Sequence, residues 1–424
     1  MRRVPGVPFG RAVILAVGSE LLTPLRIDTN SLTITSALNA TGIDVIWKAV
    51  VGDAPEVLSR LLARAREDAE LVVLSGGLGP TDDDRTRDVV SAVLGLPLRE
   101  DAAIVEAIAS RFAARGWPMP ANNRRQANVP EGAVVLPNSR GTAPGLWIEQ
   151  AGRALLLLPG PPRELAPLLE DALQAYVRPR TGGRRIVRRI VRMTGRGESL
   201  IDELLQPYYR EWAARTVPVS ATILAAMGQL ELHLSATHAD AAQAESAVAV
   251  AAEEACARVG RDAFTDRGEH LEEVVGHLLA SRGWRVAVAE SCTGGLLAGR
   301  LTAAPGASRY FDQGVVTYSN AAKVEWLGVP EALMAEHGAV SDAVARAMAS
   351  GIRERAGADV GVGVTGIAGP DGGTAEKPVG TVVIAVALRE SITSRTLHLL
   401  GDREQIRSQS AQAALDLVRR VLTP

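Results

Sequence analysis

The feature that most constrains the fold is a regular alternation of apolar runs and amphipathic stretches over residues 12–176. Strands buried on both faces appear in a sequence as apolar runs, and the helices that cover them appear as amphipathic stretches. We therefore predict an α/β fold with a doubly wound parallel sheet, covered by helices on both faces. The apolar runs are residues 12–18, 43–51 and 70–77, and the amphipathic stretches are residues 31–40, 55–66 and 86–94.

A chain of 424 residues, 47% of them hydrophobic and 22% charged, is too long for one ordinary core and predicts two or three globular domains. In the middle of the chain, strand and helix patterns alternate and one strand, LELHLSA, alternates cleanly between apolar and polar residues. This pattern predicts a small α+β connector domain between two larger α/β domains. The expected domains are residues 1–176, 177–266 and 267–424.

The stretch from residue 290 to 323 carries the best-supported chemistry. A short buried strand is followed by a turn at Gly294 and then by a helix, so Ser291 and Thr293 lie between strand and helix. Free backbone N–H groups and the helix dipole favour a phosphate or a developing oxyanion at such a place. The alternative is that strand, turn and helix are ordinary parts of an α/β fold.

Ser308, Tyr318 and Lys323 follow in the same stretch, and no histidine lies between them. Amide hydrolysis by a serine needs a base, and a lysine that burial keeps neutral can replace histidine in that role. The three residues would satisfy this need if the loop folds back. The alternatives are a turn hydroxyl for Ser308, a half-buried strand aromatic for Tyr318 and a solvated charge for Lys323.

Seven motifs follow one another in this region: AESCTGG, PGAS, TYSNAAK, HGAVS, TGIAGPDGG, KPVGTV and GDR. Together they closely resemble the C-terminal domain of the CinA family, known as a nicotinamide mononucleotide deamidase. The resemblance implies that this domain releases ammonia from the nucleotide's carboxamide without a cofactor. It implies Ser308 as the nucleophile, Lys323 as its base, and Tyr318 and Ser291 as supporting groups. The substrate-binding residues implied are Thr293, Gly294, Thr365, Gly366 and Arg403.

The residues themselves agree with part of this assignment. The planar guanidinium of Arg403 can bind two oxygens of a 5′-phosphate at once, although the same residue could be a solvated arginine at the start of a helix. Ser291 and Ser308 compete for the role of nucleophile, and the sequence alone leaves both open. Cys292, beside Ser291, is expected to be a small buried residue rather than a nucleophile.

The richest loop of the first domain is SGGLGPTDDDRT, residues 75–86. Its glycines allow the backbone to approach an anion, and its aspartates can offer hard oxygens to a divalent cation, which together suit a metal-bridged phosphate. The alternative is an acidic helix N-terminus, where aspartate also stabilises the helix dipole. No Gly-Lys-Ser/Thr follows, so the loop is not of the Walker type.

With DTN, RQAN, GTAPG and LPGPPRE, this loop resembles the N-terminal domain of the same CinA family. That domain is similar to molybdopterin-binding proteins, and in several members it is known as a metal-dependent ADP-ribose pyrophosphatase. The resemblance implies a divalent metal and cleavage to AMP and ribose 5-phosphate. The metal-site residues implied are Glu20, Asp53, Asp83 and Asp84. The substrate-site residues implied are Asn30, Gly76, Gly77, Gly79 and Thr81.

Two residues depart from the pattern of that family. Pro24 stands where a glycine is usual, so its loop is expected to differ in shape. Asp82 stands where a basic residue is common, which we expect to make the site more acidic and to weaken diphosphate binding unless a metal compensates. The N-terminal domain could therefore have lost its activity and kept only binding.

An arginine cluster in the connector suggests a rival function, that of a competence-linked binding or scaffold protein whose nucleotide sites are vestigial. Nucleic acid is nevertheless an improbable partner, because no aromatic residues are interleaved with the arginines and the formal net charge is −2. We expect these arginines to protect an exposed edge strand. They are Arg184, Arg185, Arg188, Arg189 and Arg192.

The two cysteines, Cys256 and Cys292, fit a reducing cytosol and exclude a disulfide scaffold or a cysteine-rich zinc site. No apolar run is long enough to span a membrane. We therefore expect a cytoplasmic protein without a membrane partner. Its expected partners are nicotinamide mononucleotide, ADP-ribose and a second copy of the chain, because a homodimer is the commonest soluble oligomer.

Overall fold

The computed structural model describes residues 8–226 and 228–423. The chain forms two compact units, one with residues up to 187 together with 236–246, and one with residues 188–235 and 247 onward. None of the helices in the described part is long and apolar enough to cross a bilayer. The predicted domain boundaries at residues 176 and 266 stay predictions, although each of the three predicted segments contains a main sheet of its own.

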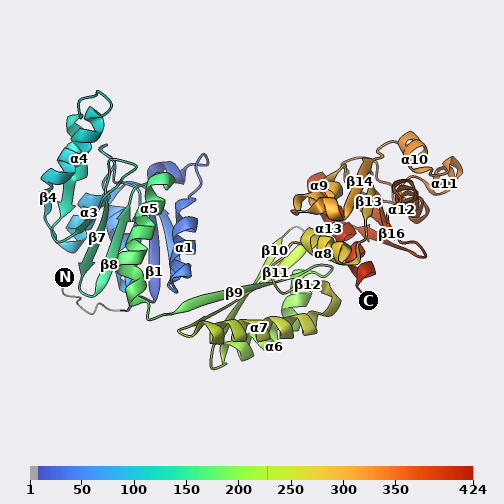
Figure 1. The fold of residues 1–424 in the computed structure, drawn as a ribbon, viewed down its shortest axis with the longest axis horizontal. Helices are drawn as coiled ribbons and strands as arrows, with labels where there is room; N and C mark the ends of the chain where they lie inside the picture. Colours follow the sequence, from blue (N-terminus) through green and yellow to red (C-terminus); the bar gives the residue numbers. More distant parts are fainter. Residues whose placement is uncertain (1–7, 227, 424) are drawn as a thin grey trace. The chain divides into compact units, whose positions relative to one another are not determined.

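The N-terminal sheet has six strands (Figure 1). Their order is β2 (Asp44–Val51), β1 (Arg11–Val17), β3 (Leu71–Ser75), β8 (Arg153–Leu158), β7 (Gly145–Gln150) and β6 (Val134–Leu136). The first four are parallel as predicted, whereas the β8–β7 and β7–β6 pairs at one edge are antiparallel. This difference arises because Ala151 and Gly152, with φ of 53° and 76°, form a two-residue hairpin between β7 and β8.

Helices cover both faces of this sheet, which confirms the doubly wound prediction. On one face Val13 and Leu15 of β1 pack with α2 (Pro55–Asp68), α3 (Thr86–Leu94) and α4 (Ala102–Ala113). On the other face Ala12 and Ile14 pack with α1 (Asn30–Ala40) and α5 (Pro162–Ala172). The remaining elements are η1 (Ser19–Leu22), η2 (Ala121–Ala127), η3 (Leu173–Val177), η4 (Arg178–Arg180) and the small sheet of β4 (Leu98–Glu100) with β5 (Asn128–Pro130).

The second sheet has four strands in the order β10 (Val219–Ala226), β11 (Gln229–His238), β9 (Arg185–Met193) and β12 (Ala263–Thr265). Alternate side chains of β11 are buried, as its sequence predicts, and the helices of this part of the chain are α6 (Glu198–Ala213) and α7 (Ala241–Val259). The expectation that the arginine-bearing strand is an edge strand is confirmed for most of its length, because β9 lies between β11 and β12 but β12 reaches only its last two residues. β12 pairs only with Arg192 and Met193, and three residues are too few to be recognised in the sequence.

The third sheet has the order β14 (Phe311–Val316), β13 (Val286–Glu290), β15 (Val360–Gly366), β16 (Thr381–Ala387) and β17 (Ile392–His398). β14, β13 and β15 are parallel, and the β15–β16 and β16–β17 pairs are antiparallel. One face of β13 packs against α8 (Leu271–Arg282), α9 (Leu296–Ala303) and α13 (Arg403–Leu422), and the opposite face packs against α10 (Asn320–Leu327) and α12 (Asp342–Ala356). Figure 1 shows these helices around the sheet, with α11 (Glu331–His337) beyond α10. This layering confirms the α/β class.

Candidate active sites

The carboxyl ends of the three parallel strands bring most of the predicted C-terminal site residues together. Val316 pairs with Glu290, which pairs in turn with Val364, so the three strands end side by side. Ser291 follows β13, Tyr318 follows β14, and Thr365 is the last residue but one of β15. In an α/β sheet this edge is where ligands bind, because side chains of several strands meet there beyond the last backbone pair.

Lys323 is the central group of this site. It lies in the first turn of α10, whose start is fixed by the Ser319 hydroxyl, and it is only 1% exposed. Its Nζ donates to Ser291 Oγ at 3.1 Å, to the Thr317 carbonyl at 2.9 Å and to the Tyr318 carbonyl at 3.4 Å. Burial lowers the pKa of this amine, because removal from water disfavours the charged form.

Ser308 does not join this group. It lies exposed in a 3-10 turn, η6 (Ala307–Arg309), before β14, whereas Lys323 follows that strand. The six residues of β14 form an extended strand of about 20 Å, with one register shift against β13, and so the loop does not fold back as the sequence-based hypothesis requires. The expected pairing of Ser308 with Lys323 is therefore corrected: within one chain, the serine in contact with the lysine is Ser291.

The N-terminus of α9 is already occupied by a side chain of the protein itself. Glu290, 1% exposed, accepts from the backbone N–H groups of Gly295, Leu297 and Ala298 at 3.0, 3.1 and 2.8 Å. A negative charge at a helix start is stabilising, and this carboxylate uses the N–H groups that the sequence assigned to a phosphate or oxyanion. The Thr293 hydroxyl nearby is buried and has no hydrogen-bond partner among the described residues.

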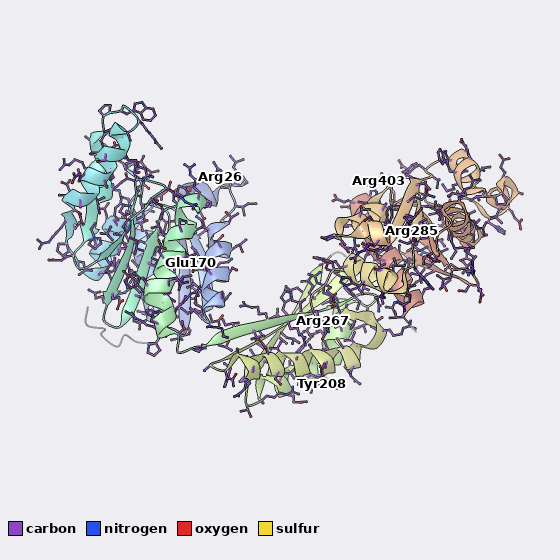
Figure 2. The ribbon with its side chains drawn as sticks, viewed as in Figure 1. Arg26, Glu170, Tyr208, Arg267, Arg285 and Arg403 are labelled. Carbon is purple, nitrogen blue, oxygen red and sulfur yellow. The ribbon has the colours of Figure 1, made fainter. Side chains whose placement is uncertain are left out.

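The first two turns of α13 supply two guanidinium groups to the site. Arg403, labelled in Figure 2, donates to the Gly369 carbonyl at 2.6 Å and to the Tyr318 hydroxyl at 2.8 Å. Arg407 donates to the Thr293 carbonyl at 2.9 Å. The sequence analysis missed Arg407, although its spacing of four residues from Arg403 places the two on one helix face.

Two further predicted residues have structural contacts of their own. The Thr365 hydroxyl donates to the Ala339 carbonyl at 2.9 Å, which joins β15 to the HGAVS motif. A Cβ atom on Gly366 would lie 3.0 Å from the Cys292 sulfur, so a glycine is needed there. Cys292 is 4% exposed and burial raises the pKa of its thiol to about 12, which confirms it as a buried residue.

The N-terminal site is a cleft of about 540 Å³ at the carboxyl edge of the parallel strands. Most of the residues predicted for this site line it: Glu20, Asn30, Asp53, Gly76, Gly77, Gly79, Asp83 and Asp84. Asn30 also joins its walls, because its amide donates to the Ser75 hydroxyl at 3.0 Å and the Gly160 carbonyl at 2.7 Å. Thr81 is not among the lining residues; its backbone N–H and its hydroxyl both donate to Asp84, which is one of them.

The glycine loop of this cleft has a backbone that only glycine permits. Gly76 and Gly77 have φ of 103° and 67°, and a Cβ atom on either would lie 2.1 Å from a neighbouring oxygen. Arg87, 4% exposed, donates to the carbonyls of Leu78 and Gly79 at 2.9 and 3.1 Å, and burial lowers the pKa of its guanidinium to about 10. These contacts hold the loop against the cleft.

The carboxylates of the cleft are not gathered into one cluster. Asp84 accepts from the Gly79 and Thr81 backbone N–H groups at 2.7 and 2.9 Å, and Asp53 accepts from the Ser19 N–H at 2.9 Å. The Thr81 hydroxyl lowers the pKa of exposed Asp83. Nowhere in residues 8–226 and 228–423 do three or more His, Cys, Asp or Glu side chains form a group that could hold a metal ion.

The two departures from the family pattern lie at the surface. Asp82 accepts from Arg125 at 2.7 Å, is fully exposed and does not line the cleft. The expectation that Asp82 makes the cleft more acidic is therefore wrong, because its charge faces solvent and is paired. Pro24 lies in the exposed loop after η1.

Arginines of residues 178–196 are largely engaged with carboxylates of the protein. Five of them form ion pairs: Arg178 with Glu170, Arg180 with Glu149, Arg189 with Asp266, Arg192 with Glu231 and Arg196 with Asp262. Only two of these five, Arg189 and Arg192, belong to the predicted cluster, so the pairing reduces only part of the positive charge that the cluster offers to a phosphate backbone.

Comparisons with known proteins agree with both parts of the chain. Residues 268–422 match a family model described as the CinA C-terminal domain, and residues 13–179 match one described as a probable molybdopterin binding domain. A putative competence-damage inducible protein of Symbiobacterium thermophilum is 46% identical over 97% of this chain and 98% of its own. A CinA-like protein of Acidobacterium capsulatum is 43% identical over 97% and 99%. A crystal structure of a CinA superfamily protein from Klebsiella pneumoniae, 38% identical, covers 36% of this chain and 98% of its own with a TM-score of 0.35.

Proposed function

The chain belongs to the CinA family, and on this basis we propose that its C-terminal part hydrolyses the carboxamide of nicotinamide mononucleotide to the carboxylate and ammonia. The observation that carries the proposal is the buried contact of 3.1 Å between Lys323 Nζ and Ser291 Oγ. A lysine without a carboxylate partner among the described residues, with a lowered pKa and a serine hydroxyl in reach, is suited to act as a base.

The reaction divides into two steps. Neutral Lys323 takes the proton of Ser291 Oγ as that oxygen bonds to the carboxamide carbon, which gives a tetrahedral oxyanion. The lysine then returns the proton to the nitrogen, the C–N bond breaks and ammonia leaves. Water, deprotonated by the same lysine, attacks the acyl-enzyme ester and releases the nicotinate mononucleotide and the free serine.

The two guanidinium groups of α13 support a nucleotide substrate. Arg403 and Arg407 lie one turn apart, and both contact loops that border Ser291. Charge-assisted pairing of a phosphate dianion with two planar guanidinium groups would fix the substrate's 5′ end. Tyr318 is 59% exposed and its hydroxyl accepts a hydrogen bond from Arg403. Its side chain then borders the bound nucleotide and does not assist the catalytic base, Lys323.

Paired serine variants test the proposal. Ser291→Ala is expected to lower kcat for ammonia release by roughly a thousandfold or more, as removal of a nucleophile does. Ser308→Ala should remain active, since this hydroxyl has no hydrogen bond to Lys323 in the described structure. Ser281→Ala, an exposed serine on α8, is the matched control. Loss of activity in Ser308→Ala with retention in Ser291→Ala would return the nucleophile's role to Ser308, as the family resemblance implies.

For the N-terminal cleft we propose that it binds a nucleoside diphosphate sugar such as ADP-ribose. The supporting observation is the glycine loop beside a cleft of about 540 Å³, held by Arg87 and open to phosphate oxygens. The family resemblance adds metal-dependent cleavage to AMP and ribose 5-phosphate. The carboxylates as arranged do not fit a metal site of protein ligands alone, so we derive no step through a metal.

Product formation from ADP-ribose with and without divalent cations tests this second proposal. Asp83→Asn is the informative variant, because the Asp83 carboxylate is exposed in the cleft, whereas Asp84→Ala would remove the hydrogen bonds that shape the loop. We expect ADP-ribose to bind without metal. If the metal-dependent cleavage that the family resemblance implies is retained, AMP should form only with a divalent cation, and at least about tenfold more slowly in Asp83→Asn. Cleavage by Asp83→Asn at the parent rate would exclude this aspartate, and no binding at all would refute the proposal.

A further inference from the structure

Beside the N-terminal cleft lies a second, smaller cavity of about 320 Å³. One of its walls is α4, which contributes Ile104 and Ile108, and the opposite wall is the segment from residue 135 to 144. Val135 and two prolines of this segment complete an aliphatic lining. A small and mostly apolar cavity with a few fixed polar groups is typical of a site for part of a small molecule.

The two cavities share a wall. Thr142 lines both of them. Asn138 lines the smaller cavity and Glu164 lines the cleft, and the Asn138 amide donates to the Glu164 carboxylate at 2.8 Å. A ligand bound in the cleft therefore has the smaller cavity directly beside it.

This wall is held rigidly. Arg111 of α4 donates to the carbonyls of Asn138 and Gly141 at 3.0 and 2.7 Å, and also to the Ser139 carbonyl. The Asn138 side-chain oxygen accepts from the backbone N–H groups of Arg140 and Gly141 at 2.9 and 2.8 Å. A Cβ atom on Gly141 would lie 1.7 Å from the Glu164 carboxylate, so a larger residue there would displace that side chain. A cavity whose walls are fixed before binding loses little entropy when it is filled.

The chemistry of the two cavities is complementary. The cleft offers a glycine backbone and polar side chains, which suit phosphate and ribose. The smaller cavity offers aliphatic carbon together with the guanidinium of Arg111, which suits the faces of a flat aromatic ring. We propose that this cavity takes the purine base of a nucleotide whose phosphates lie in the cleft. The inference rests on the proposed nucleotide binding by the cleft and adds the residues that select the base.

The test uses AMP and ribose 5-phosphate, two ligands that differ only in the base. Ala107 and Ala103 are exposed alanines of α4 that line the small cavity but not the cleft, and a tryptophan at either position fills the cavity from the surface. Ala102→Trp, on the same helix and exposed but outside the cavity, is the matched control. Dissociation constants are measured by titration calorimetry on the full chain, and the fold of each variant is checked by thermal unfolding.

The parent chain and Ala102→Trp should bind AMP at least about tenfold more tightly than ribose 5-phosphate, a difference of about 1.4 kcal/mol. Ala107→Trp and Ala103→Trp should lose this preference and bind ribose 5-phosphate as the parent does. Unchanged AMP affinity in both folded tryptophan variants would overturn the inference, and so would an equal loss for both ligands. If the parent chain binds neither ligand, the proposed function of the cleft fails. If it binds both ligands equally, the cleft still binds the phosphate and only the proposed base site is refuted.

Discussion

Among single residues, Lys323 has the least ordinary surroundings. It is buried to 1% exposure, and its amine contacts one hydroxyl and two carbonyl oxygens, none of which carries a charge that would stabilise an ammonium ion. A buried lysine without a counter-charge costs folding free energy, because the ammonium form is poorly solvated there. Such a residue is expected where function requires a neutral amine.

A pH–rate profile tests this role. Because the folded protein lowers the pKa of Lys323, the neutral amine appears at a pH below its ordinary range. The base acts in its neutral form, so kcat/KM for ammonia release should rise with pH through the lowered pKa and then level off. Lys323→Arg should be inactive at every pH, because a guanidinium stays protonated. Arginine in place of exposed Lys48 is the control, and an active Lys323→Arg variant would remove this residue from the base role.

At the scale of elements, α13 contributes both arginines of the C-terminal site from a single face. Asp402 caps the start of this helix and accepts from the Gln405 N–H at 2.9 Å, which fixes the first turn. Arg403 and Arg407 then reach the loops after β15 and β13. The helix therefore positions two positive charges near the end of the strands that carry the reactive residues.

Arg407→Met tests whether this helix recognises the phosphate. A hydrogen bond to a charged group contributes about 1.5–3 kcal/mol, so KM for nicotinamide mononucleotide should rise about tenfold or more. Nicotinamide riboside lacks the phosphate, and its kcat/KM should therefore be unchanged. Arg395→Met, an exposed arginine of β17, is the control. An equal loss for both substrates would show that Arg407 only supports the Thr293 loop.

The elements also show what the sequence can and cannot predict. Long apolar runs such as β1 and β3, and helices such as α2 and α3, were predicted within two residues because local periodicity determines them. The hairpin at Ala151, the short strand β12 and the antiparallel edge were missed, because each depends on a turn or on pairing between distant residues.

The candidate sites show the same limit. Positions at strand ends were predicted, since Ser291, Thr365 and the glycine loop follow apolar runs in the sequence. Which serine contacts Lys323 was not predicted, because this depends on the path of the chain in three dimensions. β14 lies between Ser308 and Lys323 in the sequence and separates the two residues in space. The structural role of Asp84 and the capping role of Glu290 were missed for the same reason, since an acidic residue near a helix start suits a ligand site and a cap equally well.

At the scale of the whole molecule, the two candidate sites draw on different compact units and share no residue. We therefore expect each site to keep its ligand when the other is inactivated. The rival account, a competence-linked binding or scaffold protein, gives no reason to bury a lysine against a serine. Two arginines of the predicted cluster, Arg189 and Arg192, are also paired with carboxylates, which lowers the charge that the cluster offers to DNA. Salt-dependent DNA binding without turnover would favour that account.

The most direct test of the central claim is ammonia release from nicotinamide mononucleotide by the full chain, measured with and without a metal chelator. The account predicts turnover that survives chelation and disappears in Lys323→Arg, while AMP binding by the N-terminal cleft is unchanged in that variant. No ammonia from the folded parent chain, or turnover that requires a metal, would contradict the assignment of a serine and a lysine as the reactive groups.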